Sequence, residues 1–375
     1  VWRNKGRFIL FSLVIALITT LVLFVAALAE GLAQANRQYL EKLDAELLVF
    51  QANTELSTIS SRLDRSDLNA VARIPGIQAA GPIGFASGTI LQPGDEEGLN
   101  ASLIGIEPDR PGAAPVVAGS PINSSRGSDV VIDRTIAREA GLGIGSIFTL
   151  RTIQNTEEEF FKLRVIGITD SREYQYAPSI FLPYQTWDEI RPQAGQPGSQ
   201  ASLASNVIAI KLEDPTQQTQ IAALIESRVD KVEVADISTA IKALPGYSAQ
   251  QSTLQTQQAF VLLIGILVIG GFFQIQILQK IPQIGVLKAI GVANRSVAWE
   301  VIWQIILVTA FGVTLGGLAT LGLAAGVPDS VPVQFAGSTV ALAIAALLAI
   351  GPIGGLVSVR LAVRVEPLIA LGLNQ

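Results

Sequence analysis

The chain has 375 residues, with 26 Lys and Arg against 31 Asp and Glu, and a formal net charge of −5. Hydrophobic residues make up 49% of it and charged residues 15%, where soluble domains carry about 25% charged residues. With a mean hydropathy of +0.46, this composition indicates a membrane protein. The chain has no His, Cys or Met, which excludes His/Cys zinc sites, thiol nucleophiles, Ser-His-Asp triads, disulfides and haem ligation by these residues.

Four stretches are long and apolar enough to cross a bilayer, whose core of about 30 Å needs roughly 20 residues of helix. They are residues 8–28, 259–278, 297–324 and 339–359, the last interrupted by Gly351-Pro352. The first exceeds the apolar core of about 7–15 residues in a signal peptide, so we interpret it as a retained helix. Since the first residue is Val1, we expect the natural chain to begin earlier.

The segment between the first two spans, 31–256, has a different composition. It holds 27 of the 31 acidic residues and 18 of the 26 basic ones. Residues 30–43 place apolar side chains at helical spacing and predict that the first span continues as a stalk. The polar stretch 248–258 predicts a returning stalk. Between them we expect strands at 46–50, 87–91, 102–106, 129–132, 147–152, 161–168 and 206–212, and helices at 66–73, 135–140 and 216–229.

This mixed α+β segment carries no pattern typical of catalysis or metal binding. Glu157-Glu158-Glu159 is an acidic run typical of a solvated hairpin tip. Asp129, Asp133 and Asp170 have no spacing that predicts metal ligation or acid–base chemistry. Gly127-Ser128-Asp129 does not favour a hydrolase site, because the usual base, His, is absent and no motif supports a Ser-Lys dyad.

The basic residues near the span ends predict the orientation, because Lys and Arg are enriched in cytoplasmic loops. With four spans, all eight fall on one side, and the loop 326–337 on the other side has none. We therefore expect both termini in the cytoplasm and the segment 31–256 outside. The eight residues are Arg3, Lys5, Arg7, Lys280, Lys288, Arg295, Arg360 and Arg364.

The cytoplasmic loop 280–296 reads KIPQIGVLKAIGVANRS. Ile284, Leu287 and Ile290 recur at i, i+3 and i+6, which predicts a short helix with an apolar face that ends at Gly291. From composition alone, such a helix can rest on the membrane surface, dock into a groove on a partner, or simply connect two spans.

Two motifs in this region resemble those of the FtsX-like permease family. Residues 283–291 (QIGVLKAIG) followed by Arg295 resemble the family signature E-I-G-x-L-K-A-I-G-A-x-x-R-x-I, and residues 362–371 (AVRVEPLIAL) resemble its closing A-x-R-x-[DE]-P-x-x-A-L. Residues 119–170 are similar to the periplasmic core domain of MacB-type and LolC/LolE-type permeases. The chain departs from the family at Gln283, beside Pro282, and at Gln304, where acidic residues are common.

The resemblance implies a membrane subunit of an ATP-binding-cassette transporter that works with an ABC ATPase subunit. The chain has no G-x-x-x-x-G-K-[ST] motif, so we expect no enzymatic activity, no cofactor bound directly, and ATP bound by the partner. The resemblance implies that the loop 280–296 is the coupling helix that docks on the ATPase. Its apolar side chains would anchor it there, its glycines would allow close approach to the partner and a sharp turn at the helix end, and its basic side chains would make polar contacts at the edge of the interface. Its implied contact residues are Gln283, Ile284, Gly285, Leu287, Lys288, Ile290, Gly291 and Arg295.

The spans themselves contain few ionisable residues but two pairs of glycines at i, i+4, which permit close helix packing. These are Gly312 with Gly316 and Gly351 with Gly355. Either packing within the chain or dimerisation would use them. Tight apolar spans favour mechanotransmission, in which the spans transmit movement of the coupling helix to the outer domain, over a polar channel.

The sequence thus predicts a multi-span α-helical membrane protein of the bacterial plasma membrane, with four transmembrane helices and a large α+β extracytoplasmic domain. The expected parts are a tail and first span (1–30), a MacB-like core domain with stalks (31–256), and an FtsX-like permease domain (257–375). Expected partners besides the ATPase are membrane lipid, a second permease copy and a periplasmic adaptor protein, but no nucleic acid.

Two functions remain open. The first is export or release of an amphiphile, namely a lipoprotein, glycolipid, peptide or drug. The alternative is an FtsX-like signalling subunit that controls an extracytoplasmic partner without transport. The length of the outer domain favours export, and four spans with a coupling-like loop argue against a receptor or adhesin on a passive anchor.

Overall fold

The computed structural model describes residues 5–92, 95–154, 157–191, 204–327, 331, 333–335 and 337–364. The chain forms two compact units. The helical unit contains Val1–Leu32 and Gln251–Gln375, and the mixed unit contains Ala33–Gln250. The sequence places the corresponding boundaries after residues 30 and 256.

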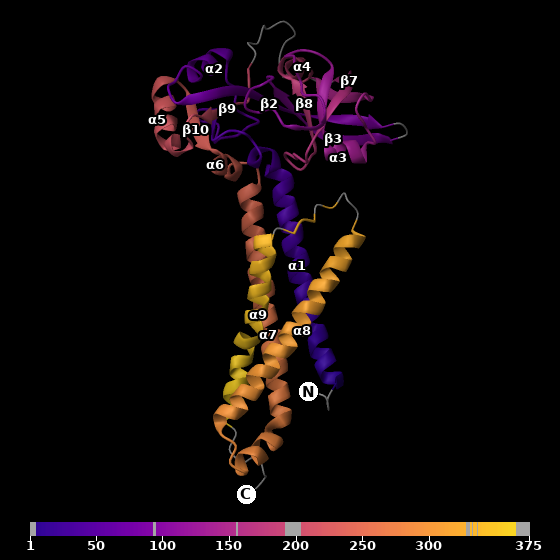
Figure 1. Ribbon diagram of the computed structural model, residues 1–375, viewed down its shortest axis with the longest axis vertical. Helices are drawn as coiled ribbons and strands as arrows, with labels where there is room; N and C mark the ends of the chain where they lie inside the picture. The colour runs from indigo at the N-terminus through magenta and orange to yellow at the C-terminus, as the bar shows by residue number, and fades with distance from the viewer. Residues whose placement is uncertain are drawn as a thin grey trace. The chain divides into compact units, whose positions relative to one another are not determined.

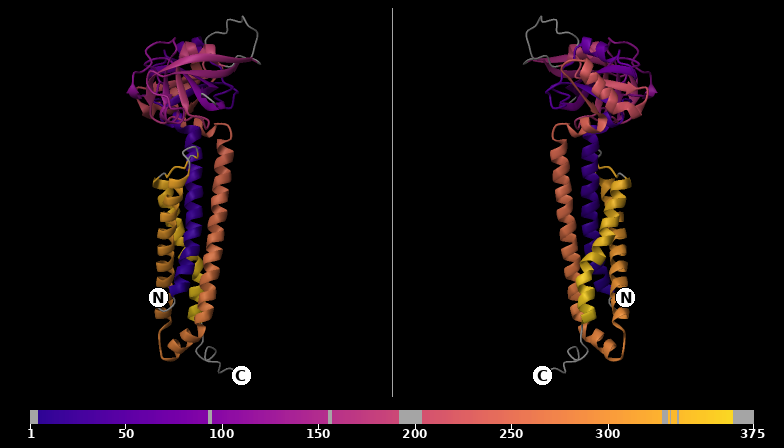
Figure 2. Two further views of the ribbon diagram at one scale, coloured as in Figure 1. Left: turned by 90° about the vertical axis from the view of Figure 1, so that its right-hand side faces the viewer. Right: turned by 90° about the vertical axis from the view of Figure 1, so that its left-hand side faces the viewer.

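Long helices form the helical unit: α1 (Lys5–Glu41), α7 (Tyr247–Ala289), α8 (Asn294–Gly326) and α9 (Gly337–Arg364) (Figures 1 and 2). Among the described residues, α7, α8 and the Phe8–Glu41 part of α1 are long and apolar enough to cross a membrane. Within α9 the apolar stretch is shorter, Val340–Leu356. The predicted interruption at Gly351-Pro352 is wrong, because α9 continues through Pro352.

The helical unit has one apolar core shared by all four helices. Ile15 of α1, Phe273 of α7, Ile305 of α8 and Ile350 of α9 are among its buried side chains. Large apolar side chains also remain exposed on the outer faces of these helices. This distribution suits lipid, which is as apolar as the core, so close packing and not the hydrophobic effect holds such helices together.

The mixed unit is a ten-stranded sheet with short helices. The strands are β1 (Leu47–Gln51), β2 (Ile77–Gln92), β3 (Asp95–Ile106), β4 (Val116–Gly119), β5 (Asp129–Asp133), β6 (Ile147–Gln154), β7 (Glu157–Thr169), β8 (Ser179–Pro183), β9 (Val207–Leu212) and β10 (Val232–Asp236). The helices are α2 (Arg65–Val71), α3 (Arg134–Glu139), α4 (Tyr184–Ile190), a 3₁₀ turn (Pro215–Gln217), α5 (Gln218–Arg228) and α6 (Ile237–Lys242).

The strand order is β10-β1-β9-β2-β3-β8-β5-β7-β4, and β6 pairs with both β2 and β7. The β3–β8 and β5–β7 pairs are parallel, and the others are antiparallel. The long strand β2 pairs with β9 along its first half and with β6 near its end. It therefore joins the two halves of the sheet.

All seven predicted strands and all three predicted helices of this unit exist, but several bounds differ. The helix predicted at 66–73 is capped by Asp64, and Asp67 completes a capping box as its third residue. Three strands and two helices were not predicted: β4, β8, β10, α4 and α6. Each is only four to seven residues long, and a segment of this length shows little periodicity.

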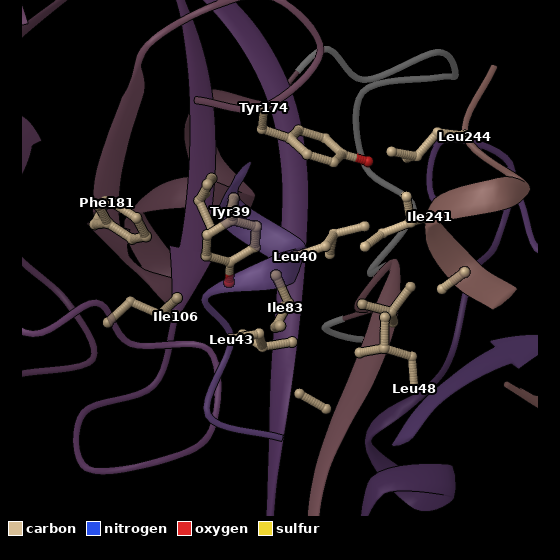
Figure 3. Close-up of a cluster of buried hydrophobic side chains, with 14 of the residues drawn as sticks. Tyr39, Leu40, Leu43, Leu48, Ile83, Ile106, Tyr174, Phe181, Ile241 and Leu244 are labelled. Atoms are coloured by element: carbon tan, nitrogen blue, oxygen red, sulfur yellow. The ribbon is translucent and has the colours of Figure 1, made fainter. Parts of the chain in front are cut away.

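The last turns of α1 lie in the core of the mixed unit, as the close-up in Figure 3 shows for Tyr39 and Leu40. Both side chains are fully buried. The Tyr39 ring packs 5.7 Å from the Phe181 ring, and its hydroxyl donates to the Gly112 carbonyl at 2.9 Å. The end of the predicted stalk is therefore part of the core of this unit.

Candidate functional site

The predicted coupling segment 280–296 is not a separate helix. Residues up to Ala289 belong to α7, which includes Pro282. Proline has no N–H to donate to the residue four positions earlier and crowds that carbonyl, which bends a helix. Figures 1 and 2 show the last turns of α7 directed away from its main axis. The sequence pattern places the helical face correctly but does not reveal that the helix is continuous.

Gly291 ends α7 as the sequence predicts. Its φ of +95° is left-handed, a conformation that glycine adopts without steric cost. The Val292 N–H donates to the Leu287 carbonyl at 3.1 Å, and the Gly291 N–H donates to the Lys288 carbonyl at 3.0 Å. This is a Schellman motif, which gives the last carbonyls of a helix their partners. After it, α8 begins with Ala293 as the N-cap.

Some side chains of the predicted apolar face are buried against other helices, and others are exposed. Ile284 and Gly285 are buried, and Ile284 belongs to the core of the helical unit. Leu287 is 37% exposed and Ile290 74%. The neighbouring Val286 is also exposed, and Gln283 and Arg295 are exposed polar residues. The segment thus presents apolar side chains on a rigid helix end.

Lys288 makes a contact within the chain that the sequence does not predict. Its ammonium donates to the Val363 carbonyl in α9 at 2.6 Å, so it ties the end of α7 to the end of α9. Lys280 similarly donates to the Gln304 side chain of α8 at 2.9 Å. Gln304 occupies one of the positions where the resembled family carries an acid, and here a neutral amide accepts the bond.

The predicted packing glycines contact helices of the same chain. A Cβ built on Gly312 would lie 2.6 Å from Ile15 in α1, and one on Gly316 would lie 2.5 Å from the Ala16 carbonyl oxygen. The second pair faces α8. A Cβ built on Gly351 would lie 2.2 Å from Thr309 Oγ1, and one built on Gly355 would lie 2.4 Å from Ile305 Cδ1. Only glycine allows these backbones to approach so closely.

Sequence reasoning missed a third close approach, between α7 and α9. A Cβ on Gly270 would lie 2.9 Å from the Gly354 carbonyl oxygen, and one on Gly354 would lie 2.8 Å from the Ile266 carbonyl oxygen. The signal was available as the pairs Gly270-Gly271 and Gly354-Gly355. Backbone therefore meets backbone at this contact.

The carboxylates of the mixed unit have structural partners. Asp129 receives two bonds from Arg164, at 2.7 and 3.0 Å. Asp133 is fully buried and accepts the Thr135 and Arg172 backbone N–H groups at 2.6 and 2.5 Å. Burial raises the pKa of Asp133 more than these bonds lower it. Among the described residues no three acidic side chains gather into a metal site.

A hollow of about 500 Å³ lies beside β5 and β7, lined by Ile122, Ile144 and Val165 among others. Two arginines also line it. Each is paired with a carboxylate, Arg164 with Asp129 and Arg126 with Glu189. Because both guanidinium groups already have anionic partners, the hollow offers no unbalanced charge for a ligand.

Comparison with protein families identifies two domains. Residues 8–228 match the MacB-like periplasmic core domain, and residues 258–367 match the FtsX-like permease C-terminal domain. The first match alone spans more than half of the chain.

Two relatives match along nearly the whole chain. HrtB of Staphylococcus haemolyticus, a candidate hemin transport system permease protein, is 26% identical over 368 residues, which cover 98% of this chain and 96% of that protein. An uncharacterized ABC transporter permease of Mycobacterium tuberculosis is 25% identical over 376 residues, with coverages of 99% and 97%.

Two solved structures match about half of the chain. The extracellular domain of the noncanonic ABC-type transporter YknZ from Gram-positive bacteria is 14% identical, with a TM-score of 0.35, and covers 51% of this chain and 99% of that one. The periplasmic region of MacB from Actinobacillus actinomycetemcomitans is 19% identical, with a TM-score of 0.36 and coverages of 52% and 90%.

Proposed function

Because the chain belongs to the family of ABC transporter permeases that joins a MacB-like periplasmic core domain to an FtsX-like permease domain, we propose that it couples ATP hydrolysis to outer-domain movement. A separate ABC ATPase subunit would hydrolyse the ATP, since the chain has no P-loop motif. Movement of the outer domain would then export or release an amphiphilic substrate.

The observation that carries this proposal is the pair of exposed apolar side chains, Leu287 and Ile290, at the capped end of α7. Burying a side chain of this size against a partner contributes about 1.5–3 kcal/mol. The Schellman motif holds the end of α7 in one conformation, so little ordering entropy is lost on docking. We assign the segment 280–296 to the contact with the ATPase.

The close glycine contacts support transmission of movement through the helical unit. Backbone-to-backbone approach, as between Gly270 and Gly354, leaves no flexible side chains to absorb displacement. In addition, α7 is one helix from Tyr247 to Ala289. A displacement of its bent inner end, beyond Pro282, would therefore act on the same helix that enters the mixed unit.

The proposed arrangement in the bilayer follows the distribution of basic residues. We propose four spans, with α9 as the fourth, both termini in the cytoplasm and the mixed unit outside. The protein would act in the bacterial plasma membrane with a second permease copy, identical or related, and with a periplasmic adaptor.

The name of the staphylococcal relative makes hemin the first substrate to test. Since the chain has no His, Cys or Met, it would have to hold such a substrate through apolar contact with the ring and charge pairing with its carboxylates, or through Tyr or carboxylate ligands. Any amphiphile that combines an apolar body with an anionic group would make the same contacts.

The test is co-purification of the full chain with its candidate ATPase from detergent-solubilised membranes. Leu287→Glu and Gly291→Trp should lose the complex, because the first places a charge in the apolar contact and the second strains the left-handed turn and adds a large ring beside the contact. Leu287→Met is the matched control and should retain it, since it conserves volume and apolarity. An undiminished complex with Leu287→Glu would overturn the assignment.

Export is tested in cells that lack the endogenous gene, by measuring growth on hemin or on another amphiphile with and without the restored chain. Restored growth that depends on Leu287 supports export coupled to the ATPase. A stable complex with nucleotide-dependent movement but no protection against any amphiphile would favour the signalling alternative.

A further inference from the structure

Both stalk ends meet a single loop of the mixed unit. The outgoing stalk end is residues 33–41 of α1, and the returning stalk end is residues 247–250 of α7. The loop is residues 170–177, between β7 and β8. A role for this loop rests on the proposed function, because it concerns how movement of the stalks reaches the outer domain.

The loop bonds to the outgoing stalk end through the main chain. The Tyr39 N–H donates to the Glu173 carbonyl at 3.0 Å, the Gln175 N–H donates to the Asn36 carbonyl at 3.3 Å, and the Tyr176 N–H donates to the Ala35 carbonyl at 3.0 Å. Backbone groups in the body of a helix ordinarily pair only within it. Here they also hold a loop that is distant in the sequence.

Charged side chains strengthen the same contact. Lys42, just after α1, donates to Asp170 at 2.9 Å and to the Ser171 carbonyl at 2.6 Å. Arg172, which is buried, returns a bond of 2.7 Å to the Lys42 carbonyl and one of 2.8 Å to Asp170. The loop and the end of α1 therefore form one hydrogen-bonded network.

Tyr176 extends this network to the returning stalk end. Its hydroxyl accepts from the Asn36 side chain at 3.2 Å and donates to Gln250 Oε1 at 2.5 Å. A single phenol thus bridges α1 and α7. A second bond joins the stalk ends directly, from Arg37 to the Tyr247 hydroxyl at 2.7 Å.

The backbone at this bridge is in a strained conformation. Gln175 and Tyr176 have φ values of +50° and +64°, in the left-handed region that residues with a side chain rarely adopt. Such a conformation persists only where surrounding contacts impose it. Here Gln175 and Tyr176 are the central pair of a two-residue turn, which is closed by paired backbone bonds between Tyr174 and Ala177 at 3.0 and 3.2 Å. The bonds to Asn36 and Ala35 attach this turn to the stalk.

At its other side the loop is tied to the sheet. The Arg172 N–H donates to the side chain of Asp133, the last residue of β5 and the N-cap of α3. Ser102 of β3 donates to the Tyr174 carbonyl at 2.7 Å, and Ser179 of β8 donates to the Arg172 carbonyl at 2.5 Å. A displaced stalk end would therefore pull on three neighbouring central strands.

We propose that the 170–177 loop is the clamp that fastens both stalk ends to the sheet, and that the Tyr176 hydroxyl is the joint that holds the two stalks in register. Tyr176 is a positioning residue, because its hydroxyl restrains the distance between α1 and α7. When that distance changes, the loop transmits the movement to β3, β5 and β8 through its bonds to those strands. Without this joint, the bond from Arg37 to the Tyr247 hydroxyl still connects the stalk ends, but the loop no longer links α7 to the sheet through Tyr176.

The test measures the distance between the stalk ends in the full-length protein in lipid nanodiscs. Because the chain has no Cys, Gln34→Cys and Ala249→Cys provide the only two sites for nitroxide labels. We expect a single narrow distance distribution by electron paramagnetic resonance. Tyr176→Phe, which removes only the bridging hydroxyl, should broaden this distribution, because the bond from Arg37 to the Tyr247 hydroxyl is then left to join the stalk ends.

Matched variants separate the joint from general damage to the fold. Tyr174→Phe removes the neighbouring hydroxyl, which contacts Thr58 of the domain and neither stalk, and should keep the narrow distribution. Gln250→Leu removes the acceptor and should broaden the distribution, whereas Gln250→Glu keeps an acceptor oxygen and should restore it. A narrow distribution with both Tyr176→Phe and Gln250→Leu would overturn the proposal.

The labels also distinguish this proposal from the proposed function. The clamp is tested without nucleotide, and the coupling is tested by adding the ATPase subunit and ATP. A narrow distribution that Tyr176→Phe broadens but ATP leaves unchanged supports the clamp and contradicts mechanotransmission. A shift with ATP that is equal in the wild type and in Tyr176→Phe contradicts the clamp alone.

Discussion

Gly84 of β2 and Gly105 of β3 lie opposite each other in the β2–β3 ladder, and the indole of Trp187 packs against both. A Cβ on either glycine would lie 2.4 Å from a ring atom. The fully buried Trp187 therefore holds α4 against the sheet only because two adjacent strands lack side chains at this point.

We expect Gly84→Ala to destabilise the protein by about 1–3 kcal/mol, the usual cost of overpacking a core. Gly88→Ala, on the same strand, is the control. Its Cβ would meet the flexible ends of Leu150 and Leu103 at 3.0 and 3.2 Å, which can move aside. Thermal unfolding of the purified full chain, followed by circular dichroism, should show a clear loss for the first variant only. Equal midpoints would show that α4 shifts to accommodate the methyl group.

The α1–α8 contact provides a second prediction. Gly316→Ala would place a Cβ against the Ala16 carbonyl oxygen, which is backbone and cannot rotate away, so we expect a loss of about 1–3 kcal/mol. Gly317 has nothing within 4 Å. Gly317→Ala should be neutral or stabilising by up to about 1 kcal/mol, because alanine favours the helix. The measurement is the temperature at which half of the protein survives as a monodisperse peak in detergent.

The left-handed turn at Gly291 predicts a graded response. Gly291→Val should cost about 1–2 kcal/mol at the end of α7, because a β-branched residue is strained at this φ. Gly291→Asn should cost less, since asparagine tolerates that region. Hydrogen exchange of the Val292 amide, which the Schellman bond protects, should accelerate more for Val than for Asn. The reverse order would contradict the assigned turn.

Asp133 should be among the most sensitive polar residues of the mixed unit. Asp133→Ala would leave the buried Arg172 N–H without its acceptor, at about 1–3 kcal/mol, and remove the cap of α3, at about 1 kcal/mol. Asp236→Ala removes the cap of α6 and an exposed bond from the Ser238 hydroxyl, so it should cost about 1 kcal/mol. The difference between the two unfolding midpoints is the measurement, and similar midpoints would argue that water replaces Asp133.

The ion pairs of Asp170 in the 170–177 loop predict that the stability of the protein falls at acidic pH. Burial alone would raise the pKa of Asp170, but the bonds from Lys42 and Arg172 outweigh it and lower the pKa to about 2. Because this folded-state pKa lies below the unfolded value of about 3.9, the carboxylate stabilises the fold fully above about pH 4 and less as the pH falls toward 2. The unfolding midpoint of Asp170→Asn should therefore change less across this window than that of the wild type. Parallel curves would contradict the role of this ion pair.

Much of the candidate site was predictable because it depends on local chemistry. The i, i+3 pattern from Ile284 to Ile290 identified a helical face, and Gly291 identified its end. The same pattern did not distinguish the buried Ile284 from the exposed Ile290. That difference depends on which side of α7 the other helices cover, and periodicity along one helix does not contain it.

The sequence by itself determined the apolar helices, the composition of the outer segment, its longer strands and the left-handed end of α7. Each of these features depends on residues that are close together in the sequence, because the periodicity of the apolar residues and the steric limits on the backbone determine local structure. The tertiary structure alone decided that Gly312 and Gly316 meet α1, that Trp187 packs on two glycines, and that Asn36, Tyr176 and Gln250 meet at one hydroxyl. Contacts between residues 74 and 140 positions apart arise only after the sheet has folded, because the packing of many side chains together decides which distant groups become neighbours.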